Sequence, residues 1–268
     1  MNRRPLVLGN WKMNGDMVRN EALLAAVLEH SAAVLASDHV DAGIAAPAPY
    51  LFQVAVRCKG RGLQWGAQDV SDEHQGAFTG EISVDMLRDF DVHFSLVGHS
   101  ERRARHGEAD AQVAKKVACL LEGGLTPVVC VGESLSQRDA GEAVAHVCAQ
   151  VLAALVNCPD DALPKVVLAY EPIWAIGTGR QASPADAQAM HAAIRGALAA
   201  RSSDAAGQVR ILYGGSLGAA TADAMFSEED IDGGLVGGAS LDATAFSTIL
   251  AAAEARALRQ SPLSIQLK

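Results

Sequence analysis

The sequence contains few aromatic residues and no long apolar run. Phe, Trp and Tyr make up only 4% of its 268 residues, although hydrophobic residues make up 50%. Alanine and aliphatic side chains must therefore fill the core, which suits helices packed closely on a sheet better than a β-sandwich. No stretch approaches the length of a membrane-spanning helix, and the apolar run near the N-terminus is too short for a signal peptide. We expect no membrane partner.

Positive charge and paired cysteines are also lacking. The formal net charge of −9 at pH 7 argues against a nucleic-acid partner, because such surfaces need clustered Lys and Arg. The cysteines are odd in number, five, and contain no C-x-x-C pair, which favours a reducing, cytoplasmic location. No H-x-H, H-E-x-x-H or acidic cluster has the spacing of a metal site, so we expect no metal and no cofactor.

Short aliphatic runs alternate with longer stretches of helical spacing, and the alternation repeats eight times. The runs cover residues 6–8, 42–46, 63–67, 94–97, 128–131, 166–169, 210–213 and 235–236. Helical faces are predicted from three of the intervening sets: Leu24, Val27, Leu28 and Leu35; Val113, Val117 and Leu120; and Val144, Val147, Val151 and Leu155. Eight β-α units without a linker predict one α/β domain, residues 1–268, folded as a closed (β/α)8 barrel. An open doubly wound sheet is the alternative, but no G-x-G-x-x-G follows the first run.

The segment AYEPIWAIGTGR, residues 169–180, ends an apolar run in a carboxylate. Pro172 cannot donate to a sheet ladder and keeps the preceding residue extended, so Glu171 marks the end of a strand. The loop that follows places two glycines around three bulky apolar residues, a composition that indicates a flap over a ligand. Taken alone, the segment is equally compatible with a surface loop that carries an ordinary ion pair. Ser183, with Pro184 and Asp186 after it, predicts the start of the next helix.

Polar residues follow several of the predicted strands. Because the active sites of such barrels lie at the carboxyl ends of the strands, Asn10, Lys12, His99, Glu101 and Glu171 are expected at one mouth. A solvated surface lysine and a core histidine are the ordinary alternatives for Lys12 and His99. His99 precedes a predicted helix, whose N-terminus disfavours imidazolium. We therefore expect a neutral ring that acts as a hydrogen-bond donor. Glu101 is interpreted as an ion-pair partner and not as a second base.

Two glycine tracts, YGGS at 213–216 and VGGAS at 236–240, follow the last two predicted strands. Backbone N–H groups in such tracts can approach an anion closely, and this part of a barrel commonly binds phosphate. We therefore predict a phosphate cradle there. Cys130 lies inside an apolar run without a histidine nearby in sequence, so it is expected to pack in the core.

These groups suit proton abstraction beside a carbonyl, with His99 and Lys12 stabilising the enediolate oxygen. The reaction predicted is aldose–ketose isomerisation of a phosphosugar. Glu171 must be a stronger base than a solvated glutamate, and apolar cover from Ile176 and Leu235 would provide this. The flap would also exclude water and keep the intermediate from expelling its phosphate.

The motifs GNWKMNG, GAQDVS, GAFTGE, VGHSERR, CVGE, YEPIWAIGTGR, YGGS and DGGLVGGASL occur in an order that resembles the triosephosphate isomerase family from residue 5 to about residue 250. The resemblance implies a TIM barrel that interconverts dihydroxyacetone phosphate and D-glyceraldehyde 3-phosphate through an enediol(ate), in glycolysis and gluconeogenesis, without a cofactor. It implies that Glu171 is the base, His99 the electrophile, Asn10 and Lys12 the substrate-binding pair, and Glu101 a partner of Lys12.

The resemblance also implies a set of phosphate-holding amides and a lid. The amides belong to Gly177, Ser216, Gly237 and Gly238. The lid comprises Pro172, Ile173, Trp174, Ala175, Ile176, Gly177, Thr178, Gly179, Arg180, Gln181 and Ala182. The family is typically homodimeric, with a loop equivalent to residues 75–81 inserted into the partner so that Thr79 reaches the region of Asn10 and Lys12.

The chain departs from the family pattern at three positions outside the proposed chemistry: Thr221 where Asn is frequent, Leu217 where Val is usual and Gly234 where Ala is common. Residues 259–268 resemble a C-terminal extension beyond the family's usual end. Three other interpretations remain open at this point. They are a paralogous isomerase of a longer phosphosugar such as a tetrulose phosphate, a non-catalytic barrel that binds phosphometabolites, and a Schiff-base aldolase that uses Lys12.

Overall fold

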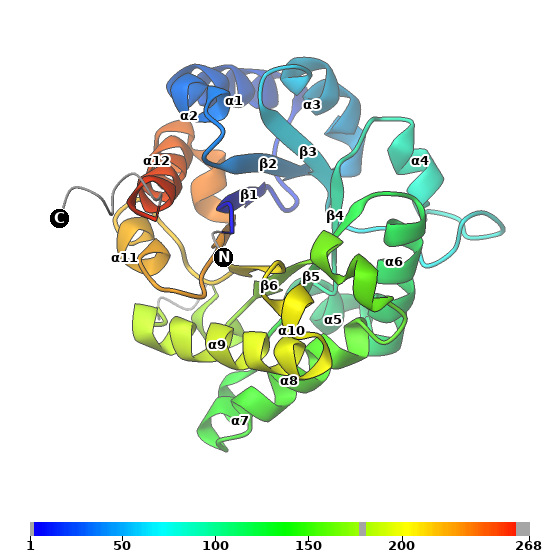
Figure 1. Ribbon diagram of the computed structural model, residues 1–268. Coiled ribbons are helices and arrows are strands. Elements are labelled where there is room, and N and C mark those ends of the chain that lie inside the picture. Colours follow the sequence, from blue (N-terminus) through cyan, green and yellow to red (C-terminus); the bar gives the residue numbers. More distant parts are fainter. Residues whose placement is uncertain (1–2, 177–180, 261–268) are drawn as a thin grey trace.

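The computed structural model describes residues 3–176 and 181–260 of the chain. Within these residues eight parallel strands form one closed barrel in the order β1-β2-β3-β4-β5-β6-β7-β8. Helices surround the barrel (Figure 1). This arrangement confirms the predicted (β/α)8 TIM barrel and excludes the open sheet. The predicted lid residues Gly177, Thr178, Gly179 and Arg180 and most of the predicted extension, residues 261–268, lie outside the described residues.

The strands begin and end close to the apolar runs of the sequence. They are β1 (Leu6–Asn10), β2 (Asp41–Ala46), β3 (Leu63–Ala67), β4 (Phe94–Val97), β5 (Thr126–Val131), β6 (Val167–Tyr170), β7 (Arg210–Tyr213) and β8 (Gly233–Val236). The larger helices are α1 (Met17–His30), α3 (Leu51–Cys58), α5 (Ser100–His106), α6 (Asp110–Glu122), α8 (Ala143–Ala154), α9 (Pro184–Arg201) and α12 (Ala243–Arg259).

Shorter helices complete the connections. They are α2 (Ala32–Ala36), α4 (Val84–Arg88), α7 (Leu135–Asp139), α10 (Ser203–Ala206), α11 (Ala222–Phe226) and the 3₁₀ turns η1 (Ala48–Tyr50), η2 (Asp160–Lys165), η3 (Ile173–Ala175) and η4 (Gly238–Leu241). None of the described helices is both long enough and apolar enough to cross a membrane.

Two predicted helical faces are partly wrong. Leu35 does not share a helix with Leu24, because α1 ends at His30 and Leu35 lies in α2. Val144 is 50% exposed, because the buried face of α8 is built around Val147 and Val151. The capping prediction for α9 is confirmed: the Ser183 hydroxyl accepts the Asp186 N–H at 3.1 Å and the Asp186 carboxylate accepts the Ser183 N–H at 3.3 Å.

Glycines at two positions leave room for larger neighbouring side chains inside and beside the barrel. A Cβ on Gly66 would lie 2.5 Å from the Phe94 ring, so the phenyl group fills the space that this glycine leaves. Similarly, a Cβ on Gly234 would lie 2.4 Å from Leu217 Cδ2. Gly234 and Leu217 are both departures from the family pattern, and they compensate each other. The Leu217 side chain, larger than the usual Val, occupies the volume that an alanine methyl group at position 234 would fill.

Within the closed barrel, β7 and β8 share only one matched residue pair, Tyr213 with Gly234. Asp232 supplies the missing contacts just before β8. Its N–H donates to Ile211 O at 2.9 Å, and its carboxylate accepts the Ile211 N–H at 2.9 Å. Its carbonyl also accepts the Leu6 N–H of β1 at 2.9 Å. One residue thus joins three strands at the seam.

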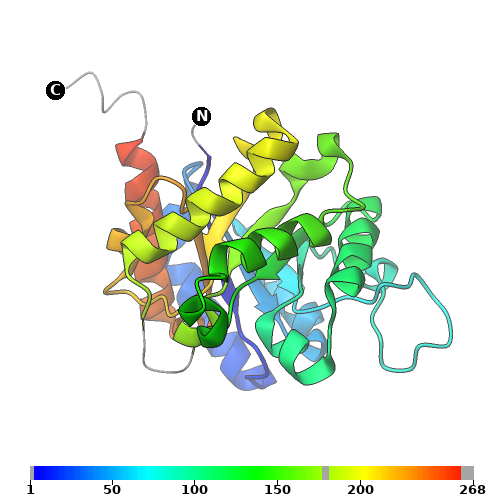
Figure 2. The same ribbon diagram turned by 90° about the horizontal axis from the view of Figure 1, so that it is seen from below.

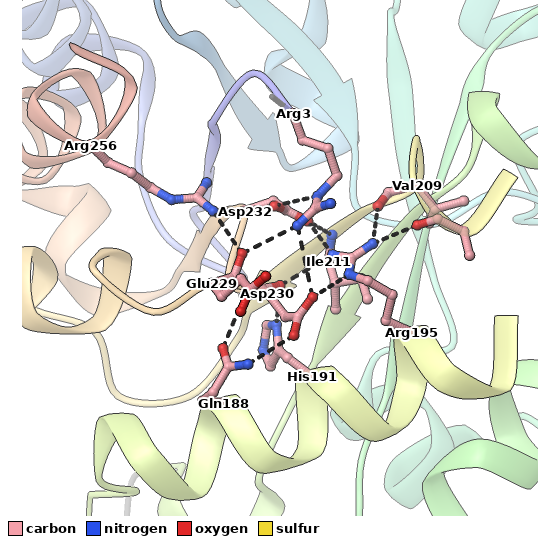
Figure 3. Close-up of polar contacts among 11 residues, drawn as sticks. Arg3, Gln188, His191, Arg195, Val209, Ile211, Glu229, Asp230, Asp232 and Arg256 are labelled. Carbon is pink, nitrogen blue, oxygen red and sulfur yellow. Dashed lines mark hydrogen bonds and ion pairs between the residues drawn. The ribbon is translucent and has the colours of Figure 1, made fainter. Parts of the chain in front are cut away.

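Three arginines balance the buried Asp232 carboxylate (Figure 3). Arg3 lies at 2.7 Å, Arg195 of α9 at 2.7 Å and Arg256 of α12 at 3.4 Å from its oxygen atoms. The carboxylate is fully buried. A buried charge is tolerated only when it is paired and hydrogen-bonded, so this network ties the seam to the outer helices.

We predict that Asp232→Asn lowers the free energy of unfolding by about 3–5 kcal/mol, because it leaves three arginines around a neutral side chain. Chemical denaturation monitored by circular dichroism measures this change. Asp160→Asn is the control, because Asp160 is 62% exposed in its pair with Arg201 and such a surface pair contributes at most about 1 kcal/mol. Equal losses in the two variants would show that the seam does not depend on this charge.

Candidate active site

The predicted site residues meet in one pocket at the carboxyl ends of the strands. Its volume is about 360 Å³, and its walls include Asn10, Lys12, His99, Glu171, Ile176, Ser216, Leu235, Gly237 and Gly238. Leu217 also lines the pocket, so this departure from the family pattern lies beside the proposed chemistry. Glu101 lines a neighbouring cavity of about 510 Å³ that shares Asn10, Lys12 and His99 with the first. Thr79 contributes to neither cavity.

Glu171 directly follows β6 and is 2% exposed. Its N–H donates to Val131 O at 2.7 Å, which fixes its backbone against the end of β5. Its carboxylate accepts the Ser100 N–H at 2.9 Å and lies 2.9 Å from His99 Nε2. A Cβ on Gly132 would lie 1.8 Å from the Glu171 carbonyl oxygen, so the close approach of the two chains requires a glycine there.

His99 is the N-cap of α5, and its ring joins Glu171 to the helix start. Nδ1 accepts the Glu101 N–H at 3.2 Å and is therefore unprotonated, which leaves the ring proton on Nε2, facing Glu171. This hydrogen bond fits the expected neutral donor. The direction of the pKa shift is opposite to that expected from the helix N-terminus, however. Burial alone would lower the pKa of His99, but the adjacent Glu171 carboxylate outweighs burial and raises it.

Lys12 is held in a left-handed backbone conformation, with φ of 51°. Asn10 Oδ1 accepts its N–H at 2.9 Å, and Gln68 Nε2 donates to its carbonyl at 2.9 Å. The ammonium group lies 2.7 Å from Glu101 Oε1. Burial would raise the pKa of Glu101, but Lys12 outweighs it and lowers the pKa. Glu101 is therefore the ion-pair partner that the sequence predicts.

Residues of both predicted phosphate-binding glycine tracts line the same pocket as the Glu171 carboxylate. Ser216 and Gly238 are exposed to the pocket, and Gly238 begins η4. A Cβ on Gly237 would lie 3.7 Å from Lys12 Cε, so the glycine backbone runs close beside the lysine stem. An anion bound to these glycines would lie near the cation of Lys12, which is the electrostatic arrangement expected for a phosphate site.

Sequence reasoning missed Gln68 and Glu133. Glu133 is fully buried behind β6, and its Oε1 accepts the Tyr170 hydroxyl at 3.0 Å and Trp174 Nε1 at 2.8 Å. It therefore anchors the first residues of the predicted lid. An acid that ends the apolar run VVCVGE repeats the pattern that identified Glu171, and it could have been found by the same argument.

Cys130 is fully buried inside the barrel, and burial raises the pKa of its thiol well above the ordinary value. It packs in the core as predicted. Among the described residues, no group of His, Cys, Asp and Glu side chains is arranged to hold a metal ion.

We predict that Glu171→Gln lowers the pKa of His99, because the variant removes the carboxylate that raises it and leaves burial and Lys12, both of which lower it. NMR titration of the imidazole C–H signals measures the change, with His99→Gln used for assignment. Glu101→Gln should give a smaller downward shift, since the Glu101 carboxylate is 3.8 Å from Nδ1. A His99 pKa that is unchanged in Glu171→Gln would contradict this assignment.

The comparisons with known proteins agree with the barrel fold. The family model described as triosephosphate isomerase matches residues 5–253. The triosephosphate isomerase of Bordetella pertussis is 52% identical over 214 residues, which cover 80% of this chain and 83% of the relative. Those of Cupriavidus taiwanensis and Thiobacillus denitrificans are 50% and 48% identical over 213 residues, again 80% of this chain and 85% and 84% of the relatives. The chain belongs to the triosephosphate isomerase family.

Proposed function

We propose that this protein interconverts dihydroxyacetone phosphate and D-glyceraldehyde 3-phosphate, a reaction of glycolysis and gluconeogenesis. The observation that carries the proposal is the placement of one buried carboxylate, one imidazole and one ammonium group in a single pocket with two glycine tracts. Glu171, His99 and Lys12 are the proposed catalytic residues, with Asn10 and Glu101 as their partners. Ser216, Gly237, Gly238 and, outside the described residues, Gly177 are the proposed phosphate ligands.

In the proposed mechanism Glu171 removes a proton from the carbon beside the carbonyl. The electron pair moves onto the carbonyl oxygen, where the Nε2–H of His99 and the charge of Lys12 stabilise the enediolate. The proton then returns to the neighbouring carbon. The Ser100 N–H and the His99 ring hydrogen-bond the Glu171 oxygen atoms. In the proposed mechanism, substrate replaces Glu171 at the imidazole and frees the carboxylate for proton transfer.

The segment 172–182 is proposed as a lid over this pocket. Its described part packs Ala175 and Ala182 into the protein and brings Ile176 to the pocket wall beside Glu171. Closure of apolar side chains over the site would remove water and retain the enediolate phosphate.

We predict that wild-type protein turns over triose phosphate in a coupled assay and that Glu171→Asp lowers kcat by about 100-fold, because it withdraws the carboxylate by about 1 Å. Glu142→Asp, the same change at an exposed residue outside the pocket, serves as the control. Folded wild-type protein without turnover would refute the proposed activity. An unchanged kcat in Glu171→Asp would refute Glu171 as the base.

Two assays separate the other candidate functions. Comparison of kcat/KM on triose and tetrulose phosphates distinguishes this reaction from that of a paralogue. Borohydride trapping with substrate would label Lys12 in a Schiff-base aldolase, whereas a Lys12 that stays in its 2.7 Å ion pair with Glu101 would remain unlabelled. A barrel that only binds phosphometabolites would show affinity without turnover. The location is proposed to be a reducing cytoplasm, as the cysteine pattern suggests.

We also propose a homodimer. The connection between β3 and α4 projects away from the barrel in both views (Figures 1 and 2). Its residues 73–81 are exposed, including Phe78 at 45%. Met13 is 95% exposed and lines the 510 Å³ cavity together with Lys12 and Glu101. Insertion of this loop into the same cavity of a second copy would bury both apolar side chains and bring Thr79 towards Lys12.

We predict that Thr79→Arg shifts the protein from dimer to monomer, because a charge at the loop tip would have to be buried against the partner. Size-exclusion chromatography with light scattering measures the mass. Thr244→Arg, at an exposed position on α12, is the matched control and should remain dimeric. A wild-type protein that is monomeric at micromolar concentration would contradict the proposed assembly.

A further inference from the structure

Arg138 of α7 contacts three residues around the base of the proposed lid. Its guanidinium carbon lies 4.5 Å from the centroid of the Trp174 ring. Its Nη2 lies 2.7 Å from Asp186 Oδ1, and its Nη1 lies 3.7 Å from Glu133 Oε1. The side chain is 30% exposed, so these contacts are only partly screened by water.

The contacts of Arg138 lie on both flanks of the lid. Trp174 follows Glu171 by three residues, in η3, before the undescribed residues 177–180. Asp186 lies after them, in the first turn of α9, where it forms the capping box with Ser183. One guanidinium group therefore joins the point where the chain leaves the proposed base to the point where it enters the next helix.

Glu133 connects this arrangement to the barrel. It follows β5, its carbonyl accepts the Ile173 N–H at 3.2 Å, and its buried carboxylate accepts Trp174 Nε1 at 2.8 Å. The same carboxylate needs a cation nearby because it is fully buried. Arg138 provides that cation while its guanidinium carbon lies over the indole ring of Trp174.

Arginine suits this position for a geometric reason. Its flat guanidinium group can stack on an aromatic ring and still donate hydrogen bonds from its edges, whereas the ammonium group of lysine is a compact point charge. Lysine could retain the pair with Asp186 but could not stack on Trp174 and reach Glu133 at the same time. The contacts of Arg138 therefore predict that a substitution that removes its charge and one that keeps the charge but removes the planar group will have different effects.

We propose that Arg138 is a positioning residue for the isomerase reaction: it holds both flanks of the lid in register with the end of β5, and thereby places the segment that follows Glu171. This inference rests on the proposed function. Arg138 is absent from the residues that line the pocket, so it acts through Trp174 and Asp186 and not on the substrate.

A loosened lid has a chemical signature that a simple loss of stability lacks. If the enediolate phosphate is exposed, its electron pair can expel inorganic phosphate by breaking the carbon–oxygen bond. The remaining neutral enol then gains a proton on its terminal carbon and loses the proton of its hydroxyl group, which gives methylglyoxal without an oxidant or a reductant. Phosphate released per isomerisation event therefore reports how well the lid retains the intermediate.

The test compares Arg138→Met and Arg138→Lys with wild type, with D-glyceraldehyde 3-phosphate as substrate. We expect Arg138→Met to lower kcat/KM by about 10-fold to 100-fold and to raise phosphate release per isomerisation by about 10-fold or more. Compared with Arg138→Met, Arg138→Lys should restore the melting temperature but should reverse only a minor part of the increase in phosphate release. Asp186→Asn removes the ion pair on one flank only, so its phosphate release per isomerisation should lie between the values for wild type and Arg138→Met.

Arg201→Met is the matched control. Arg201 is also a partly exposed arginine of an ion pair, 2.8 Å from Asp160, and it donates to the Leu155 carbonyl at 2.7 Å, away from the pocket. It should lower the melting temperature without changing phosphate release. Trp174 fluorescence adds a direct readout, because removing the cation from the indole face should alter its emission in Arg138→Met and not in Arg201→Met.

Active wild-type protein with unchanged phosphate release in folded Arg138→Met and Arg138→Lys would overturn the inference and leave the proposed function intact. If Arg138→Met does not fold, phosphate release per isomerisation in Arg138→Lys and Asp186→Asn tests the inference instead. Wild-type protein without isomerase turnover would instead refute the proposed function itself.

Discussion

The site depends on a closed barrel, and the sparsely paired contact between β7 and β8 is the constraint on that closure. Asn10 ends β1, whereas His99 and Glu171 follow strands that are far from β1 in sequence. These residues reach one pocket only because the sheet returns to its first strand. At that seam the Asp232 carboxylate accepts a hydrogen bond from Ile211, in place of a continuous ladder. Its buried charge in turn needs the surrounding arginines, so charge balance supports the sheet on which catalysis is proposed to occur.

The pocket joins rigid and adjustable elements. The backbone of Glu171 is fixed against β5, and its close fit depends on the missing side chain of Gly132. Its carboxylate, by contrast, is held by hydrogen bonds from His99 and Ser100 that a substrate can replace. Arg138 and Glu133 add a second fixed point beyond the base.

Much of the fold could be predicted because local patterns specify it. Eight apolar runs separated by helical periodicity indicate the barrel, and Pro172 places Glu171 at a strand end. Ser183 marks the start of α9 through its own hydrogen bonds. Even the glycine tracts could be assigned to the pocket wall, because the carboxyl ends of parallel strands meet at one rim.

Features that depend on contacts between residues distant in sequence could not be predicted from local patterns. The direction of the His99 pKa shift follows from a 2.9 Å contact with Glu171, which overrides the effect of the helix N-terminus. The positions of Arg138 and Glu133 beside Trp174 appear only when three elements pack together. The sequence by itself determined the order of strands and the chemical groups at their ends. Only the tertiary structure decided how those groups pair, because electrostatic and packing energies change over fractions of an ångström.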